Sequence, residues 1–96
     1  MQVECRFFGP FREDVGERSV QLSTDAETYG DLLAELERAH PALEGRILDD
    51  GSLSGDVSVT RDKRNIRQID GLETPVEDGD VIRLTPSITG GLDGRP

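Results

Sequence analysis

One stretch of this 96-residue chain has a clear helical repeat, and it limits what the rest can fold into. Thr28 is suited to cap a helix, because its hydroxyl can accept a hydrogen bond from a free N–H of the first turn. Pro41 predicts the end of the helix, because the residue before a proline avoids helical backbone angles. Between these two residues the apolar side chains form one stripe, made of Tyr29, Leu32, Leu33, Leu36 and Ala39.

Short runs of alternating polar and apolar residues surround this helix and predict β-strands. They span residues 2–8 and 18–23 before the helix, and 56–61, 65–69 and 80–85 after it. Between the first two strands, Phe11-Arg12-Glu13-Asp14-Val15-Gly16 predicts a short helical turn. One amphipathic helix can cover only one face of a sheet. The sequence therefore predicts a two-layer α+β domain, with one main helix on a mixed sheet of four to five strands.

The domain is expected to span residues 1–86, followed by a flexible tail at residues 87–96. No apolar run approaches transmembrane length, and no basic region with an apolar block follows Met1, so we expect a cytoplasmic protein without membrane contacts. Cys5 is the only cysteine and His40 the only histidine, so we expect no disulfide and no metal site. Cys5 lies in a predicted strand, so we expect it to be a buried structural thiol. His40 is expected to be a residue at the C-terminal end of the helix.

The charge balance limits the possible partners. Twenty acidic and eleven basic residues give a net charge of −9, which argues against binding to nucleic acid or to anionic membranes. Lys63 is the only lysine, beside ten arginines. This diffuse acidic composition with scarce lysine resembles that of proteins from extreme halophiles, and an ordinary acidic domain is the alternative.

The segment Pro86-Ser87-Ile88-Thr89-Gly90-Gly91 follows the last predicted strand. Two consecutive glycines give a thin backbone without Cβ atoms, which can enter a channel too narrow for other residues. A frayed chain end is the alternative explanation for this segment.

Four motifs, in order, resemble the MoaD/ThiS sulfur carriers and the small archaeal modifier proteins. They are Phe7–Gly16, Thr28–Leu36, Glu77–Ile82 and the Gly90-Gly91 pair. The resemblance spans residues 3–91 and implies the β-grasp, or ubiquitin-like, fold. The chain departs from the family pattern in having Thr85 before Pro86, Ser87 after it, no Asn-Gly turn after the third strand, and five further residues, 92–96, after the diglycine.

The resemblance implies a protein that is carried and modified, not an enzyme. A separate ubiquitin-activating-type enzyme, using ATP and Mg²⁺, would adenylate the α-carboxylate of Gly91. Gly90, which has no side chain, would let the tail pass into the active site of that enzyme. The product would become a thiocarboxylate or an isopeptide bond to a lysine. We expect no catalytic side chain and no bound cofactor on the chain itself. Lys63 is the candidate acceptor for automodification.

Partner proteins are expected to dock at Phe8, Ile82 and Ile88. The alternative for Phe8 is that its side chain only covers the edge of the core. Candidate downstream partners are a molybdopterin-synthase large subunit, a tRNA-thiolation enzyme and lysines of target proteins. Because residues 92–96 follow Gly91, a processing protease would have to remove them. The alternative is a β-grasp protein-binding module that does not conjugate and has a residual diglycine.

Overall fold

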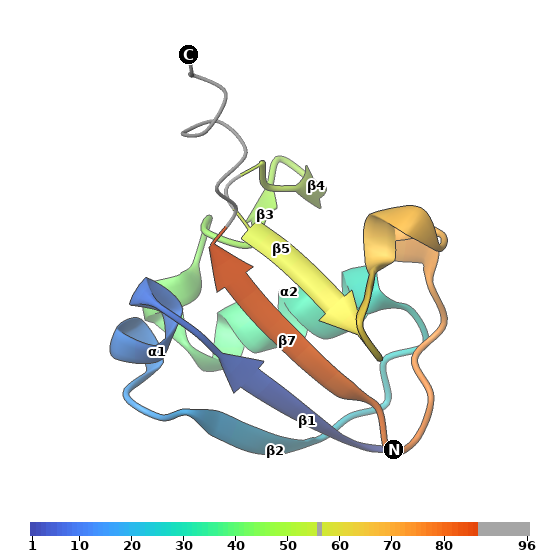
Figure 1. Ribbon diagram of the computed structural model, residues 1–96, viewed down its shortest axis with the longest axis horizontal. Coiled ribbons are helices and arrows are strands. Elements are labelled where there is room, and N and C mark those ends of the chain that lie inside the picture. The colour runs from blue at the N-terminus through green and yellow to red at the C-terminus, as the bar shows by residue number, and fades with distance from the viewer. Residues whose placement is uncertain (56, 87–96) are drawn as a thin grey trace.

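The computed structural model describes residues 1–55 and 57–86, which form one helix-on-sheet domain (Figure 1). Within these described residues, two α-helices and seven strands follow one another with three short 3₁₀ turns. In chain order they are β1 (Gln2–Phe7), α1 (Pro10–Val15), β2 (Ser19–Ser23), α2 (Tyr29–Ala39), η1 (Pro41–Leu43), β3 (Leu48–Asp49), β4 (Ser52–Leu53), β5 (Val57–Arg61), β6 (Arg64–Asn65), η2 (Ile66–Gln68), η3 (Gly71–Glu73) and β7 (Val81–Pro86).

The main sheet has five strands in the order β2-β1-β7-β5-β6. β1 and β7, the first and last strands, lie parallel at its centre, and the register pairs Cys5 with Ile82. All other neighbours in this sheet are antiparallel. The predicted α+β fold is therefore confirmed: a mixed five-stranded sheet with one main helix and β-grasp strand order.

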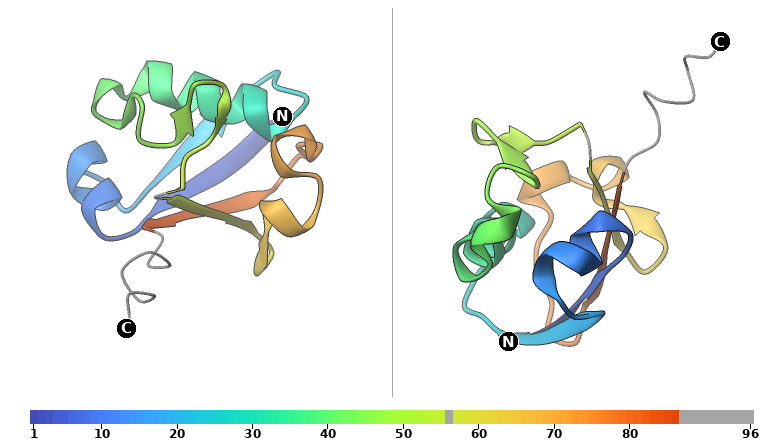
Figure 2. Two further views of the ribbon diagram at one scale, coloured as in Figure 1. Left: turned by 90° about the horizontal axis from the view of Figure 1, so that it is seen from above. Right: turned by 90° about the vertical axis from the view of Figure 1, so that its left-hand side faces the viewer.

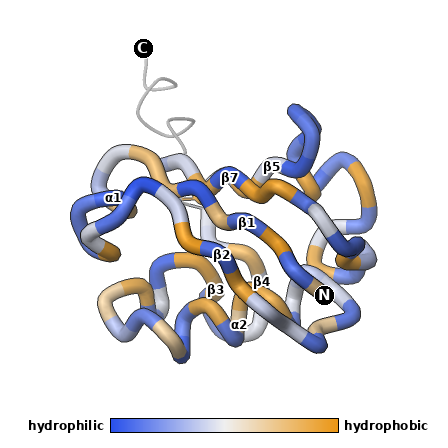
Figure 3. The backbone as a smooth tube through the Cα atoms, turned by 90° about the horizontal axis from the view of Figure 1, so that it is seen from below, coloured by the Kyte–Doolittle hydropathy of each residue, from blue (hydrophilic) through white to orange (hydrophobic). Residues whose placement is uncertain are grey.

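α2 packs on one face of the sheet, and the core lies between these two layers (Figure 2). The alternation along β1 explains this arrangement, because Val3, Cys5 and Phe7 are buried while the residues between them face the other side. Figure 3 shows the same alternation of hydrophobic and hydrophilic residues along the chain. The largest fully buried side chains come from every layer: Tyr29, Phe7, Phe11, Leu32, Leu33, Leu36, Leu43, Ile47, Ile66, Ile82, Leu84 and Val3.

The ends of α2 follow the predicted signals. Thr28 has extended backbone angles, and its hydroxyl accepts a hydrogen bond of 3.3 Å from the N–H of Asp31. The helix ends at Ala39, and His40 is its C-cap, with its N–H donating to the carbonyl of Leu36 at 3.0 Å. Ala39 is exposed, so the buried stripe of the helix ends at Leu36.

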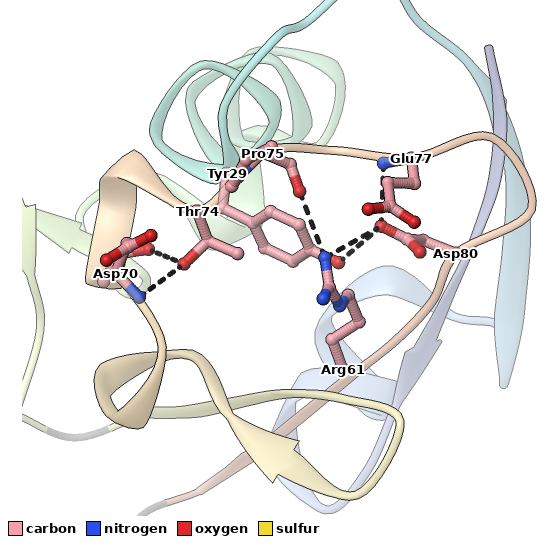
Figure 4. Close-up of polar contacts among 8 residues, drawn as sticks. Tyr29, Arg61, Asp70, Thr74, Pro75, Glu77 and Asp80 are labelled. Atoms are coloured by element: carbon pink, nitrogen blue, oxygen red, sulfur yellow. Dashed lines mark hydrogen bonds and ion pairs between the residues drawn. The ribbon is translucent and has the colours of Figure 1, made fainter.

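A buried polar cluster joins the start of α2 to the start of β7 (Figure 4). The Tyr29 hydroxyl donates to Oδ2 of Asp80 at 3.0 Å, and the same oxygen accepts from the N–H of Glu77 at 3.0 Å. Nη1 of Arg61 lies 3.9 Å from this oxygen and donates to the carbonyl of Pro75 at 3.2 Å. Burial, together with the Asp80 carboxylate, raises the pKa of the Tyr29 hydroxyl above its ordinary value.

Two segments differ from the prediction. The strand expected over 65–69 is wrong: only Arg64–Asn65 pairs with β5, and the chain then turns into η2. The Asn65 side chain explains this turn, because its Oδ1 accepts from the N–H of Arg67 at 2.8 Å and caps η2. The segment 41–55, in which the sequence predicts no strand, contains the β3–β4 hairpin.

Candidate functional site

The candidate site is the end of the sheet at which β7 finishes. Pro86 is the last described residue, so Ile88, Gly90 and Gly91 lie outside the described residues. Beside it, Val57 at the start of β5 is paired with Pro86. β1 ends on the other side, where the N–H of Phe8 donates to the carbonyl of Leu84 at 3.1 Å. The base of the tail is therefore set between two strands.

Gly9 lies close to this base. Its φ of 61° and ψ of −137° lie in a region that only glycine adopts readily. A Cβ at this position would lie 3.1 Å from Cγ and 3.4 Å from Cδ of Pro86. The carbonyl of Gly9 accepts from the N–H of Arg12 at 3.0 Å, which starts α1. The corner between β1 and α1 thus lies against the last residue before the tail.

A shallow hollow of about 270 Å³ lies on the uncovered face of the sheet, close to this corner. It is lined by Glu4, Arg6, Phe8, Arg12, Arg18 and Ser19. The guanidinium carbon of Arg12 lies 5.7 Å from the centre of the half-buried Phe8 ring, and Glu4 pairs with Arg6 at 2.7 Å. Three arginines against one glutamate make this spot locally positive on a chain of net charge −9. We call it the arginine hollow.

Ile82 does not belong to this surface, which corrects the expectation that it contacts a partner. Its side chain is fully buried, with no exposed area. In β7 the residues alternate between the two faces, and Ile82 is paired with the buried Cys5 on the face that α2 covers. Its neighbours Val81 and Arg83 are the partly exposed residues.

Lys63 lies far from the tail base. It is exposed and occupies the two-residue turn between β5 and β6, with a φ of 71° after the 51° of Asp62. Because β5 is antiparallel to β7, this turn lies at the opposite end of the sheet from Pro86. The length of β5 separates the two by roughly 13 Å.

The remaining candidate groups are structural. Cys5 is buried, and burial raises the pKa of its thiol to about 12, with Glu4 and Glu35 adding to the shift, so it stays protonated and is no nucleophile. The His40 ring packs edge-on to Phe7 at 6.2 Å. Over residues 1–55 and 57–86, no three acidic, histidine or cysteine side chains gather as a metal site. In the same ranges no helix is long and apolar enough to cross a membrane.

Comparison with known proteins decides the family. The ThiS family model matches residues 5–91, nearly the whole chain. The chain belongs to the ThiS family. The resemblance to the MoaD/ThiS carriers and the small archaeal modifier proteins is thereby confirmed, and the match ends at Gly91, with residues 92–96 beyond it.

The proteins to which this ThiS-family chain is similar include modifier proteins and a putative sulfur carrier. Small archaeal modifier protein 3 of Haloferax volcanii is 38% identical over 92 residues, which cover 95% of this chain and all of the relative. A putative sulfur carrier protein of Archaeoglobus fulgidus is 38% identical over 73 residues, covering 73% of this chain and 83% of the relative. The solution structure of small archaeal modifier protein 1 from Methanosarcina acetivorans has a TM-score of 0.81 at 32% identity, covering 94% and 96% of the two chains.

Sequence reasoning missed two parts of the site. The contact between Gly9 and Pro86 joins residues 77 positions apart, and no periodic pattern indicates it. Gly9 lies between a predicted strand and a predicted helical turn, where a glycine directly after an aromatic strand end also permits close backbone packing. The arginine hollow combines residues of β1, α1 and the start of β2, so only the fold brings its charges together.

Proposed function

We propose that this chain is a ubiquitin-like protein modifier or sulfur carrier whose reactive group is the α-carboxylate of Gly91. The observation that carries the proposal is the place of the diglycine. The family match ends at Gly91, and β7 ends at Pro86, five residues earlier. A carboxylate on such a tail could be presented to a partner while the folded domain docks beside it. Removal of residues 92–96 would have to come first, by a processing protease.

The chemistry would be supplied by a ubiquitin-activating-type enzyme with ATP and Mg²⁺. A Gly91 carboxylate oxygen would attack the α-phosphorus of ATP, which forms an acyl-adenylate and releases pyrophosphate. Attack of hydrosulfide on the acyl carbon would then release AMP and leave a thiocarboxylate. Attack of a lysine amine, with loss of one proton, would instead release AMP and leave an isopeptide. The chain's own contribution is shape, because Gly90 and Gly91 let the backbone approach closely.

Docking of the domain would use the arginine hollow beside the tail base. Phe8 offers a half-buried aromatic surface, and Arg12 covers its ring at 5.7 Å. Ile88, which follows Pro86 by two residues in the sequence and lies outside the described residues, is the proposed apolar contact of the tail. Three arginines there suit a partner surface with exposed carboxylates.

The relatives support both products and do not choose between them. One is named as a modifier and matches this chain over its whole length, and another is named as a putative sulfur carrier. Modification would have lysines of target proteins as acceptors. Sulfur transfer would have a molybdopterin-synthase large subunit or a tRNA-thiolation enzyme as the recipient.

Lys63 is the proposed acceptor for attachment of one copy to another. It is exposed, and it carries the only side-chain amine of the chain. Its turn lies at the opposite end of the sheet from Pro86, so a copy attached there would leave the tail end of the first copy open. Branched peptides from conjugates made in its native cells should carry the diglycine remnant at Lys63.

A second candidate function is favoured by residues 92–96. A chain that keeps them has no carboxylate at Gly91, and its β-grasp domain would then act as a binding module that does not conjugate.

Pyrophosphate exchange tests the proposal directly. A chain ending at Gly91 keeps every described contact, because the described fold ends at Pro86. With the activating-type enzyme from the same cells, this chain should support ATP–pyrophosphate exchange, and the 96-residue chain should not. A Gly90→Val variant ending at Gly91 should be much weaker. Absence of exchange with the Gly91-ended chain, or equal exchange with both chains, would reject adenylation at Gly91.

A further inference from the structure

We infer that Gly9 is a positioning residue: it forms a seat for Pro86 and thereby fixes where the tail leaves the domain. The inference deepens the proposed function and rests on it, because a fixed tail base matters only if the tail is used. It differs from a role in docking or chemistry, since Gly9 has no side chain to offer a partner. Its evident contribution is the space it leaves.

Pro86 has a neighbour on each side. On one side Val57 of β5 is its register partner. On the other side the Gly9 backbone approaches so closely that a Cβ there would lie 3.1 Å from Pro86 Cγ, tighter than ordinary van der Waals contact. The proline ring also fixes its own φ, so the chain direction at Pro86 has little freedom.

The backbone of Gly9 is itself held in place. The N–H of Phe8 just before it donates to the carbonyl of Leu84 at 3.1 Å. On the other side, the N–H of Arg12 donates to the Gly9 carbonyl at 3.0 Å, and Nε of Arg12 donates to the carbonyl of Phe7 at 3.3 Å. The two bonds of Arg12 hold the corner together, and the bond from Phe8 to Leu84 joins the corner to β7. Movement of the seat away from Pro86 would strain this last bond.

The position of Pro86 limits where Gly91 can reach. Five residues of chain span at most about 17 Å, so a shift of Pro86 moves the whole region that the carboxylate can occupy. Misplacement of a reacting group by about 1 Å can already cost about 100-fold in rate. Docking of the domain and threading of the tail must succeed together, and both depend on the position of the base.

Gly16 offers a matched control for Gly9. Both glycines flank α1 and have positive φ, 61° for Gly9 and 86° for Gly16. A Cβ at Gly16 would meet no atom within 4 Å. Gly16→Ala therefore tests a positive φ next to α1 without disturbing Pro86. Gly9→Ala adds both the strain of its ψ of −137° and the close approach to Pro86, and the proline variants described below separate these two effects.

The first test needs no enzyme. In the 96-residue protein, NMR should show nuclear Overhauser contacts between the Gly9 α-protons and the Pro86 ring protons. Amide shifts of residues 84, 85 and 87 should change in Gly9→Ala and stay unchanged in Gly16→Ala. Absent contacts, or equal changes in the two variants, would overturn the inference whatever the fate of the proposed function.

The second test uses pyrophosphate exchange with chains ending at Gly91. Gly9→Ala should lower the exchange rate at low protein concentration by about tenfold or more, and Gly16→Ala by less than about twofold. If Gly9→Ala fails to fold, Pro86→Ala decides. It removes the seated ring atoms without straining Gly9, and it should lose activity where Pro41→Ala, an exposed proline on η1, does not.

The outcomes separate the two claims. No exchange with the unmodified Gly91-ended chain refutes the proposed function. Exchange with that chain, but equal losses in Gly9→Ala and Gly16→Ala or in the two proline variants, refutes the positioning role alone.

Discussion

At the scale of single residues, the core holds two weak acids that folding keeps protonated. Burial raises the pKa of the Cys5 thiol from 9.0 to about 12 and moves the pKa of the Tyr29 hydroxyl in the same direction. Both groups can ionise more readily in the unfolded chain than in the folded one. Each therefore couples unfolding to proton release at alkaline pH.

The sign of this coupling gives a pH prediction. The contribution of Cys5 to stability should be fully present below about pH 9 and should be lost as pH rises from about 9 to about 12. Urea titrations at pH 8, 9.5 and 11 should show a falling free energy of unfolding, and a shallower fall in Cys5→Ala. Identical pH dependence in the two proteins would contradict a buried, protonated Cys5.

The buried cluster at the start of α2 gives a second prediction at this scale. Tyr29→Phe keeps the ring but removes the hydrogen bond of 3.0 Å to Asp80, so it should lower the free energy of unfolding by about 1–2 kcal/mol. Chemical denaturation measures this change. In the background of Asp80→Asn the same substitution should cost less, since its acceptor is altered. Equal costs in both backgrounds would argue against coupling of the two side chains.

At the scale of elements, the turn between β5 and β6 has an unfavourable sequence. Asp62 and Lys63 both have positive φ, the geometry in which Asn-Gly is favoured, and this is the turn where the family pattern Asn-Gly is missing. Lys63→Gly should raise the free energy of unfolding by about 1 kcal/mol, because glycine adopts this φ without a steric cost. Lys63→Ala is the control and should bring little gain. A gain of the same size in both would assign the effect to loss of the lysine side chain.

Elements with strong local signals were predictable from the sequence, and those set by tertiary contacts were not. α2 was predicted because its apolar stripe, its Thr28 cap and Pro41 agree. The strand over 65–69 was wrong because the Asn65 cap outweighs a weak apolar pattern. The β3–β4 hairpin depends on Glu37, whose carboxylate accepts from the N–H groups of Ile47 and Leu48 at 3.0 and 2.9 Å, and no local pattern indicates that contact.

The candidate site also contains residues that the sequence indicated and residues that only the structure could identify. The diglycine and Phe8 were identified from the sequence, since a glycine pair and an aromatic that breaks the alternation are visible there. Ile82 was misassigned as a contact because its face depends on the register of β7 with β1. The seat at Gly9 required the structure, because the sign of φ and the nearness of Pro86 are tertiary facts.

At the scale of the whole molecule, the charge of −9 should make stability depend on salt. In dilute buffer, repulsion among twenty acidic residues opposes the compact state, and salt screens it. Thermal unfolding should therefore move to higher temperature between dilute buffer and molar KCl. Equal midpoints would contradict the interpretation of this surface as adapted to high salt and would favour an ordinary acidic domain.

The whole molecule is organised around one end of its sheet. The central parallel pair β1 and β7 brings the first strand beside the last, so the corner at Gly9 reaches the base of the tail. The arginine hollow lies near the same end, and Lys63 at the opposite end. This arrangement suits a domain that presents its C-terminal tail to partners, provided that the tail ends at Gly91.

The intact mass of the protein purified from its native cells tests that condition most directly. The proposed function predicts a mass reduced by residues 92–96, with Gly91 free, as a thiocarboxylate or joined to another protein. A chain that retains residues 92–96 and carries no adduct would contradict it and would point to a binding module with a residual diglycine.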